Sequence, residues 1–113
     1  MGTTQSKSYK INYEDMQIAI KQSSTCIINT LPVTEQDCLI KNTINHKLEE
    51  KFINDNINNL SYKIIIYGKN CNDENIYTKY TQLINLGFTN IFMYTGGLFE
   101  WLTLQEIYGN EEF

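Results

Sequence analysis

The chain has 113 residues, enough for one compact domain and too few for two. It is 42% hydrophobic and 19% charged, a composition that can offset the entropy lost on folding and that excludes a disordered chain. Its formal net charge is −4, and all nine of its basic residues are lysines. Nucleic-acid binding usually needs a basic face and guanidinium groups, so we expect no nucleic-acid partner.

The expected cellular location depends on membrane segments, secretory signals and cysteine pattern. The sequence has neither the roughly 20 apolar residues of a membrane-spanning helix nor the apolar core of a secretory signal. The three cysteines, Cys26, Cys38 and Cys71, are odd in number and show no Cys-x-x-Cys spacing, which disfavours a disulfide scaffold or a zinc site. We therefore expect a cytoplasmic protein without a metal ion or a cofactor.

Residues 1–8 are polar and show no periodicity, which predicts a flexible arm before a single domain over residues 9–113. The first residues match the Met-Gly-x-x-x-Ser/Thr pattern for N-myristoylation, with the acyl chain on Gly2. A single myristoyl chain with few nearby lysines gives weak and reversible membrane contact. The arm therefore predicts partial membrane association, and its alternative interpretation is a plain disordered tail.

The first half of the domain predicts a helix, a strand and a second helix. Asn12 precedes two acidic residues, as at a helix N-terminus, and the apolar residues Met16, Ala19 and Ile20 follow at helical spacing. Residues 25–28 predict a strand, residues 32–43 a loop, and residues 43–44 a very short strand. A second helix is expected to be capped by Asn45 and to carry an apolar stripe of Leu48, Phe52, Ile57 and Leu60.

The second half contains the clearest strand, residues 62–67. Its three consecutive isoleucines at 64–66 favour a central parallel strand covered on both faces. After a turn at 68–73, a helix carries Ile76, Tyr80, Leu83 and Ile84, and Gly87 ends it. A buried strand at 90–94 and a turn at 95–97 lead into a last helix with Trp101, Leu104 and Ile107. This alternation predicts an α/β fold with a mostly parallel sheet and helices on both faces.

One loop has the composition expected of a functional site. In parallel sheets ligands bind where strands end, and Cys71 lies between the clearest strand and the following helix. Backbone N–H groups and the helix dipole there would favour the thiolate and would hold an anionic group bound to the sulfur. Its alternative interpretation is that of an incidental small residue in a turn.

The same segment resembles the catalytic half of a rhodanese domain. The resemblance lies in the strand at 64–68, the cysteine loop, the helix ending Leu86-Gly87-Phe88, and the strand, double glycine and tryptophan of residues 90–101. Segments 27–30 and 39–45 resemble the family's N-terminal half, so the resemblance covers residues 9–108. It implies a rhodanese-like three-layer α/β sandwich, with Cys71 as the catalytic cysteine.

The resemblance implies a sulfurtransferase that carries sulfane sulfur on Cys71 as a persulfide. Its partner would be a small sulfur donor or acceptor, or a protein thiol. The implied binding loop consists of Asn72, Asp73, Glu74, Asn75 and Ile76. The family usually closes this loop with an arginine, where this chain has Ile76, and the two carboxylates would repel an anionic donor. These departures favour an alternative, a catalytically inactive rhodanese-like module for binding or regulation.

Other candidate residues carry less chemistry. The chain has no arginine to hold an oxyanion, which disfavours the tyrosine phosphatases and arsenate reductases that share this fold. His46 is the single histidine and is expected at the surface of a helix start. Cys26 lies in an apolar strand and is expected in the core.

Overall fold

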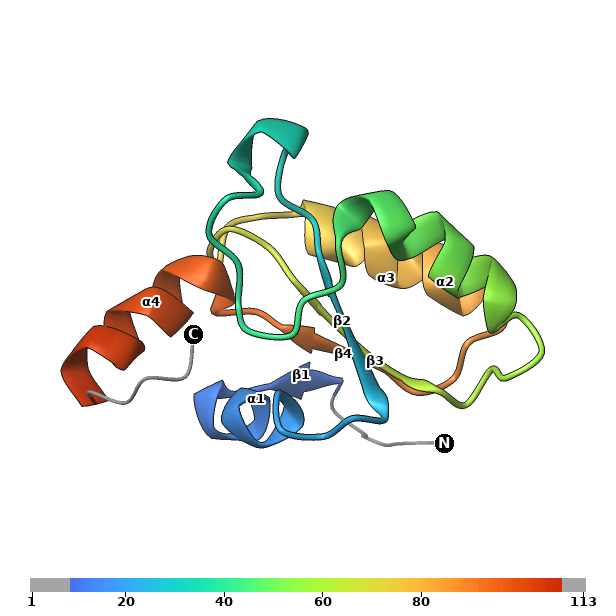
Figure 1. The fold of residues 1–113 in the computed structure, drawn as a ribbon, viewed down its shortest axis with the longest axis horizontal. Coiled ribbons are helices and arrows are strands. Elements are labelled where there is room, and N and C mark those ends of the chain that lie inside the picture. The colour runs from blue at the N-terminus through green and yellow to red at the C-terminus, as the bar shows by residue number, and fades with distance from the viewer. Residues whose placement is uncertain (1–8, 109–113) are drawn as a thin grey trace, which may run out of the picture.

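The computed structural model describes residues 9–108, which fold around one sheet (Figure 1). Its strands are β1 (Lys10–Ile11), β2 (Thr25–Asn29), β3 (Lys63–Tyr67) and β4 (Ile91–Tyr94). They lie in the order β1-β4-β3-β2, and every neighbouring pair is parallel. The α-helices of the described chain are α1 (Tyr13–Ala19), α2 (Glu49–Asp55), α3 (Asn75–Asn85) and α4 (Gly97–Tyr108), with short 3-10 helices η2 (Val33–Glu35) and η3 (His46–Leu48). The predicted α/β fold with a parallel sheet is confirmed.

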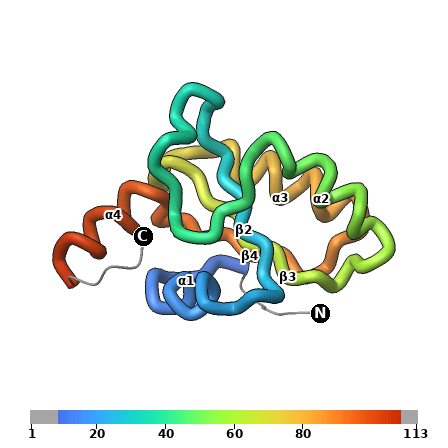
Figure 2. The backbone as a smooth tube through the Cα atoms, viewed as in Figure 1, coloured from blue at the N-terminus to red at the C-terminus, as the bar shows by residue number. Residues whose placement is uncertain are grey.

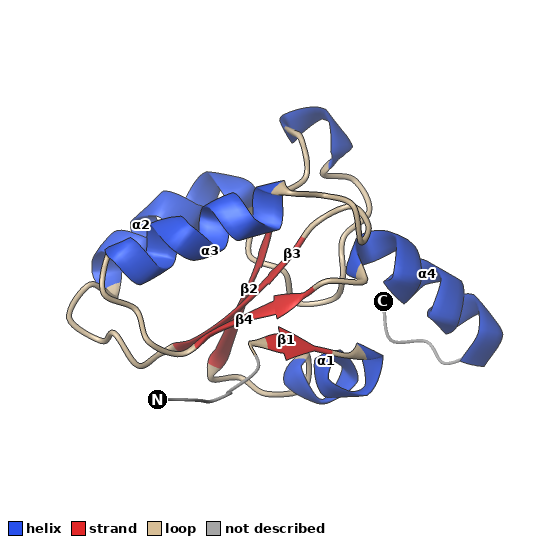
Figure 3. Cartoon of the chain, turned by 180° about the vertical axis from the view of Figure 1, so that it is seen from behind, coloured by secondary structure: helices blue, strands red, loops and turns tan. Residues whose placement is uncertain are grey.

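The core has two halves, one on each face of the sheet. Alternate residues of a strand point to opposite faces, so Ile64 and Ile66 pack with α2 and α3, whereas Ile65 and Tyr67 pack with α1 and α4. All four side chains have no exposed surface. Figure 3 shows the resulting layers, with α2 and α3 together on one side of the sheet. The prediction of a central strand covered on both faces is confirmed.

Two helix ends have the chemistry that the sequence predicts. At the start of α1, the Asn12 side chain accepts the Asp15 N–H at 2.8 Å, and the Asp15 carboxylate accepts the Asn12 N–H at 3.3 Å. At the end of α3, Gly87 has a φ of +106°, and the Phe88 N–H donates to the Leu83 carbonyl at 3.1 Å. Both boundaries are set locally, which is why the sequence identifies them.

The predicted second helix is wrong in its extent. Asn45 caps η3, where its side chain accepts the Lys47 N–H at 2.9 Å, and α2 ends at Asp55. Beyond that end the Asn56 side chain donates to the Phe52 carbonyl at 2.9 Å, a local bond that competes with helix continuation. Two residues of the predicted stripe lie outside α2 and are exposed, Leu48 before it and Ile57 after it.

Two other expectations need correction. The strand expected at 43–44 is a single bridge between Ile27 and Thr43. In α4 the buried positions are Gly97, Trp101 and Gln105, while Ile107 is 65% exposed. Apolar residues occur on all sides of α4, so helical spacing alone does not identify its buried face.

Tyr67 ties the segment between β2 and η3 to the sheet. Its hydroxyl accepts the Ile40 N–H at 3.1 Å and forms a 2.8 Å hydrogen bond with the Thr43 hydroxyl. Burial raises the pKa of Tyr67 to about 12. Burial, together with the Glu49 carboxylate, raises the pKa of Cys26 to about 12 as well.

These buried acids predict a loss of stability at alkaline pH. The unfolded chain releases the Cys26 and Tyr67 protons near pH 9 and 10, whereas the folded protein keeps them to about pH 12. The free energy of unfolding should therefore fall above pH 9, by up to about 1.4 kcal/mol per pH unit for each group. Urea unfolding at intervals from pH 7 to 11 measures this slope, and a flat profile would contradict it.

A pair of variants assigns the effect. Tyr67→Phe should lose about 1–3 kcal/mol at pH 7, because the Ile40 N–H loses its acceptor, but should show a shallower alkaline decline. Tyr77→Phe removes an exposed phenol on α3 and should keep the wild-type profile.

Candidate functional site

The candidate site lies where the chain leaves two neighbouring strands toward opposite faces of the sheet. β3 continues into α3 on one face, and its neighbour β4 continues into α4 on the other. Figure 2 shows the loop after β3 and the start of α4 at the same end of the sheet. Open parallel sheets place ligand sites at such a point, beyond the carboxyl ends of the strands.

A groove of about 440 Å³ opens at this end. It is lined by Ile11, Asn12, Tyr13, Glu14, Cys71, Thr95, Gly96, Glu100, Leu104 and Tyr108. These residues come from the ends of β1 and β4, the start of α1, the loop after β3, and α4. The Cys71 side chain is exposed there, and Cys38 is exposed elsewhere, whereas Cys26 is buried in the core as predicted. The predicted catalytic cysteine is thus accessible in a groove.

A tight turn presents Cys71. The Asp73 N–H donates to the Asn70 carbonyl at 3.1 Å, which places Cys71 and Asn72 at the two central positions of the turn. The Asn72 N–H donates to the Asn70 side-chain oxygen at 2.9 Å. The turn is held by its own polar groups.

Asp73 has a structural role that the sequence analysis missed. Its carboxylate accepts the Lys69 N–H at 2.9 Å and the Asn75 N–H at 3.0 Å, so it joins the loop to the first turn of α3. An aspartate just before a helix is a capping signal, and that signal was available in the sequence.

The expected N–H cradle for an anion is not formed by these groups. Within the loop, the N–H groups of Lys69, Asn72, Asp73 and Asn75 all donate to other loop atoms. At the start of α4 the Leu98 and Phe99 N–H groups donate to loop carbonyls, each at 2.9 Å. Those two would otherwise be free donors at a helix N-terminus. The loop donors are therefore used within the loop, and the α4 donors are used on the loop carbonyls.

Gly97 allows this close approach. Its φ is +73°, and a Cβ there would lie 2.8 Å from the Gly68 carbonyl oxygen and 2.9 Å from the Asn70 nitrogen. At Gly96, by contrast, a Cβ would overlap only the Glu100 side chain. The Glu100 carboxylate therefore folds back over Gly96, in the wall of the groove.

The residues of the predicted binding loop lie in different environments. None of its residues beyond Cys71 lines the groove, and Ile76 is buried against the sheet on the α3 side. Glu74 is exposed just before α3. His46 lies at the start of η3, as expected, and is half-buried. Gly2 and the predicted arm lie outside the described residues.

A polar cluster beneath the groove was also missed by sequence reasoning. The Gln105 amide donates to the Tyr13 hydroxyl at 2.9 Å. The Tyr94 hydroxyl, the Trp101 indole nitrogen and the Gln105 carbonyl oxygen are buried without a partner in the described chain. Burial and the nearby Glu100 carboxylate raise the pKa of Tyr94. A glutamine within the apolar sequence of α4 was the available signal.

The groove carries negative charge. Glu14 and Glu100 are the charged residues of its lining, and neither forms an ion pair in the described part of the chain. Lys69, on the loop before Cys71, is 3.7 Å from Glu35 of η2. The charge of Glu100 thus faces the groove without a neutralising cation.

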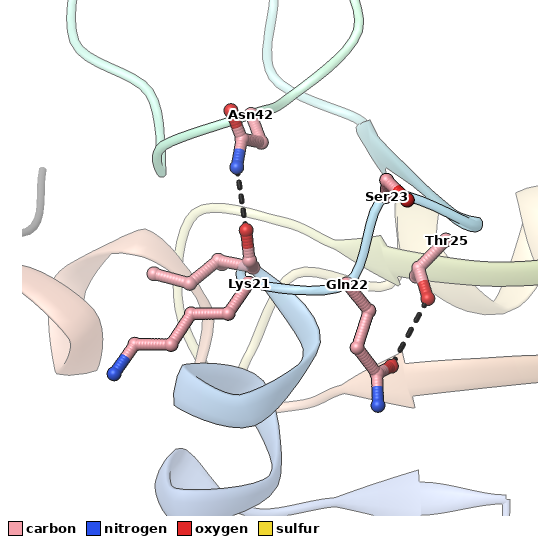
Figure 4. Close-up of a pocket in the computed structure, with 6 residues that line it drawn as sticks. Lys21, Gln22, Ser23, Thr25 and Asn42 are labelled. Atoms are coloured by element: carbon pink, nitrogen blue, oxygen red, sulfur yellow. Dashed lines mark hydrogen bonds between the residues drawn. The ribbon is translucent and has the colours of Figure 1, made fainter.

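A second hollow, of about 380 Å³, lies near the first residue of β2, at the amino end of the strands (Figure 4). Its lining residues form hydrogen bonds with one another: the Asn42 side chain donates to the Ile20 carbonyl, and the Thr25 hydroxyl donates to the Gln22 side chain at 3.2 Å. Lys21 is the charged residue of its lining. Among the described residues, Lys21 forms no hydrogen bond with the Ser23 or Thr25 hydroxyl of this hollow.

Residues 9–108 contain no group of three histidine, cysteine, aspartate or glutamate side chains placed to hold a metal ion. Over the same range, none of the helices has both the length and the apolar character required to cross a membrane.

The two adjacent glycines predict unequal effects of the same substitution. Gly97→Ala should destabilise the fold by about 1–3 kcal/mol, because its backbone is left-handed and its Cβ would meet backbone atoms. Gly96→Ala should cost less, because its backbone is not left-handed and its new Cβ would meet Glu100 side-chain atoms rather than backbone atoms. Chemical unfolding of both variants checks the order, and equal losses would contradict the described contact.

Comparison with known proteins finds similarity of fold only. No family description matches the chain, and no curated protein matches it. Among solved structures, the crystal structure of the Alr3790 protein from Anabaena sp. is similar, with a TM-score of 0.66 and 15% sequence identity. The match covers 83% of this chain and 76% of that one. At this identity the likeness establishes a shared α/β fold.

Proposed function

We propose that this chain is a rhodanese-like protein that carries a sulfane sulfur on Cys71 as a persulfide. The observation that carries the proposal is the exposed Cys71 thiol in a groove at the point where β3 and β4 diverge. The resemblance of residues 64–101 to the catalytic half of rhodaneses supports the same assignment. The partner in this proposal is a small sulfur donor or acceptor, or a protein thiol.

The proposed sulfur transfer needs one nucleophile from this protein, the Cys71 thiolate. The Cys71 thiolate attacks the outer sulfur of a donor such as thiosulfate, the sulfur–sulfur bond of the donor breaks, and sulfite leaves with the bonding electrons. Cys71 is left as a persulfide. A second thiolate then attacks the outer sulfur of the persulfide and regenerates the Cys71 thiolate. No external oxidant or reductant is consumed in either step.

Intact mass spectrometry tests the first step. Incubation with thiosulfate or 3-mercaptopyruvate should add about 32 Da, the mass of one sulfur atom, to the protein. Cys71→Ser should lose this increment, whereas Cys38→Ser, which removes the other exposed thiol, should keep it. Absence of the increment with both donors, or its persistence in Cys71→Ser, would refute the assignment.

A catalytically inactive binding or regulatory module is the second candidate. It is favoured by the internal hydrogen bonds of the loop N–H groups and by the carboxylates of the groove. In such a module Cys71 would have no need of an activated thiolate.

The alkylation rate of Cys71 as a function of pH separates the two candidates. An active carrier should show a midpoint below the value of about 8.5 that is typical of a free thiol. An inactive module should show a midpoint at or above that value. The measurement is made in Cys38→Ser, so that a single exposed thiol of the described chain is observed, with 2-mercaptoethanol as the reference.

We infer a cytoplasmic protein in which a myristoyl chain on Gly2 gives weak membrane contact, as the sequence pattern at residues 1–7 indicates. The acidic net charge of −4 would be repelled by anionic lipids, so the acyl chain would supply nearly all of the attraction.

A further inference from the structure

We propose that the sulfur compound that reacts with Cys71 is positively charged, as an aminothiol or its persulfide is. The inference rests on the proposed function and specifies its substrate class. It is carried by the groove around the thiol, in which the charged lining residues are Glu14 and Glu100.

Glu100 contributes one of these charges. It lies in the first turn of α4, is half-buried, and folds its carboxylate over Gly96 in the groove wall. Since no cation of the described chain pairs with it, its charge acts on whatever enters the groove. Glu14, exposed in the first turn of α1, adds a second negative charge.

The Tyr94 hydroxyl lies beside the Glu100 carboxylate. It is fully buried, and Tyr94 is not among the residues that line the groove. Burial and the Glu100 carboxylate raise the pKa of Tyr94, so the phenol is neutral at physiological pH and the groove charge is that of the two glutamates. A primary ammonium has three N–H donors and can pair with the Glu100 carboxylate. An anion at the same place would meet an unpaired carboxylate.

The usual attractions for an anion are weak at this site. The Lys69, Asn72, Leu98 and Phe99 N–H groups already donate within the protein. The side chain of Lys69, the basic residue of the Cys71 loop, is paired with Glu35. Dianionic thiosulfate is therefore a poorer match for this groove than a cationic sulfur compound.

An aminothiol can accept the sulfur from Cys71 in one displacement. The thiolate of an aminothiol attacks the outer sulfur of the Cys71 persulfide, and a new sulfur–sulfur bond forms as the old one breaks. The products are the Cys71 thiolate and the aminothiol persulfide, whose ammonium group keeps its proton throughout.

Charged thiol reagents with the same reactive group test the proposal directly. Aminoethyl and sulfonatoethyl methanethiosulfonate both form a mixed disulfide with a thiolate and release methanesulfinate. Their rate constants at Cys71 are measured in the Cys38→Ser protein at low salt and normalised to those of 2-mercaptoethanol. The normalised cation-to-anion ratio should be about fivefold or more, and should approach one near 1 M salt.

A matched pair of variants locates the charge. Glu100→Gln should lower the ratio about threefold. Glu106→Gln removes the same charge from an exposed position on α4 outside the groove lining and should change the ratio less.

The outcomes separate this inference from the proposed function. A normalised ratio of one at low salt, or equal effects of the two glutamate variants, would overturn the cationic substrate class even if thiosulfate loads Cys71. A high ratio that depends on Glu100 would support it even if no persulfide forms from thiosulfate. With loaded protein, cysteamine should accept sulfur faster than 3-mercaptopropionate, each relative to its rate with a small-molecule persulfide; the reverse order would also overturn the inference.

Discussion

The start of α4 is held against the loop after β3 by two backbone hydrogen bonds, from Leu98 to Gly68 and from Phe99 to Lys69. A helix begins with N–H groups that lack a partner within the helix, and here two of them find carbonyls of the neighbouring loop. The approach is so close that position 97 has no room for a side chain. Cys71 lies on one side of this contact and Glu100 on the other, so it sets the geometry of the whole groove.

The same contact limits the chemistry of the groove. The loop N–H groups donate to loop atoms and the first α4 N–H groups donate to loop carbonyls, so fewer donors are left to stabilise an anion next to the thiol. The carboxylates of Glu14 on α1 and Glu100 on α4 also repel an anion that approaches the thiol. The site thus combines the position expected of a reactive cysteine with an electrostatic environment that favours cationic partners.

The correct parts of the fold prediction came from local sequence patterns. The isoleucines of β3, the Asn12 cap and the Gly87 stop each act within a few residues, and each prediction was confirmed. The two residues of β1, Lys10 and Ile11, show no periodicity and form a strand only because β4 pairs with them. A sequence pattern of that length cannot predict a strand.

The site was harder to predict because its residues meet through the fold. Cys71 was identified from its place after a strand, a local feature. Glu100 and Tyr94 became relevant only when the turn at Gly96 brought the Glu100 carboxylate back over the groove. The N–H groups of the loop were misjudged because the side chains of Asn70 and Asp73 accept several of them.

The pairing of β1 with β4 has a consequence for the order of assembly. Lys10 pairs with Met93 and Ile11 with Tyr94, so this edge joins opposite ends of the described chain. Such a contact closes a very long loop, and it cannot gain its hydrogen bonds until β4 has joined the sheet. A two-residue edge strand is also among the first parts of a domain to open locally. Since Ile11 lines the groove, we expect its wall on the β1 side to form last in folding and to exchange its amide protons fastest, while the Cys71 loop stays closed.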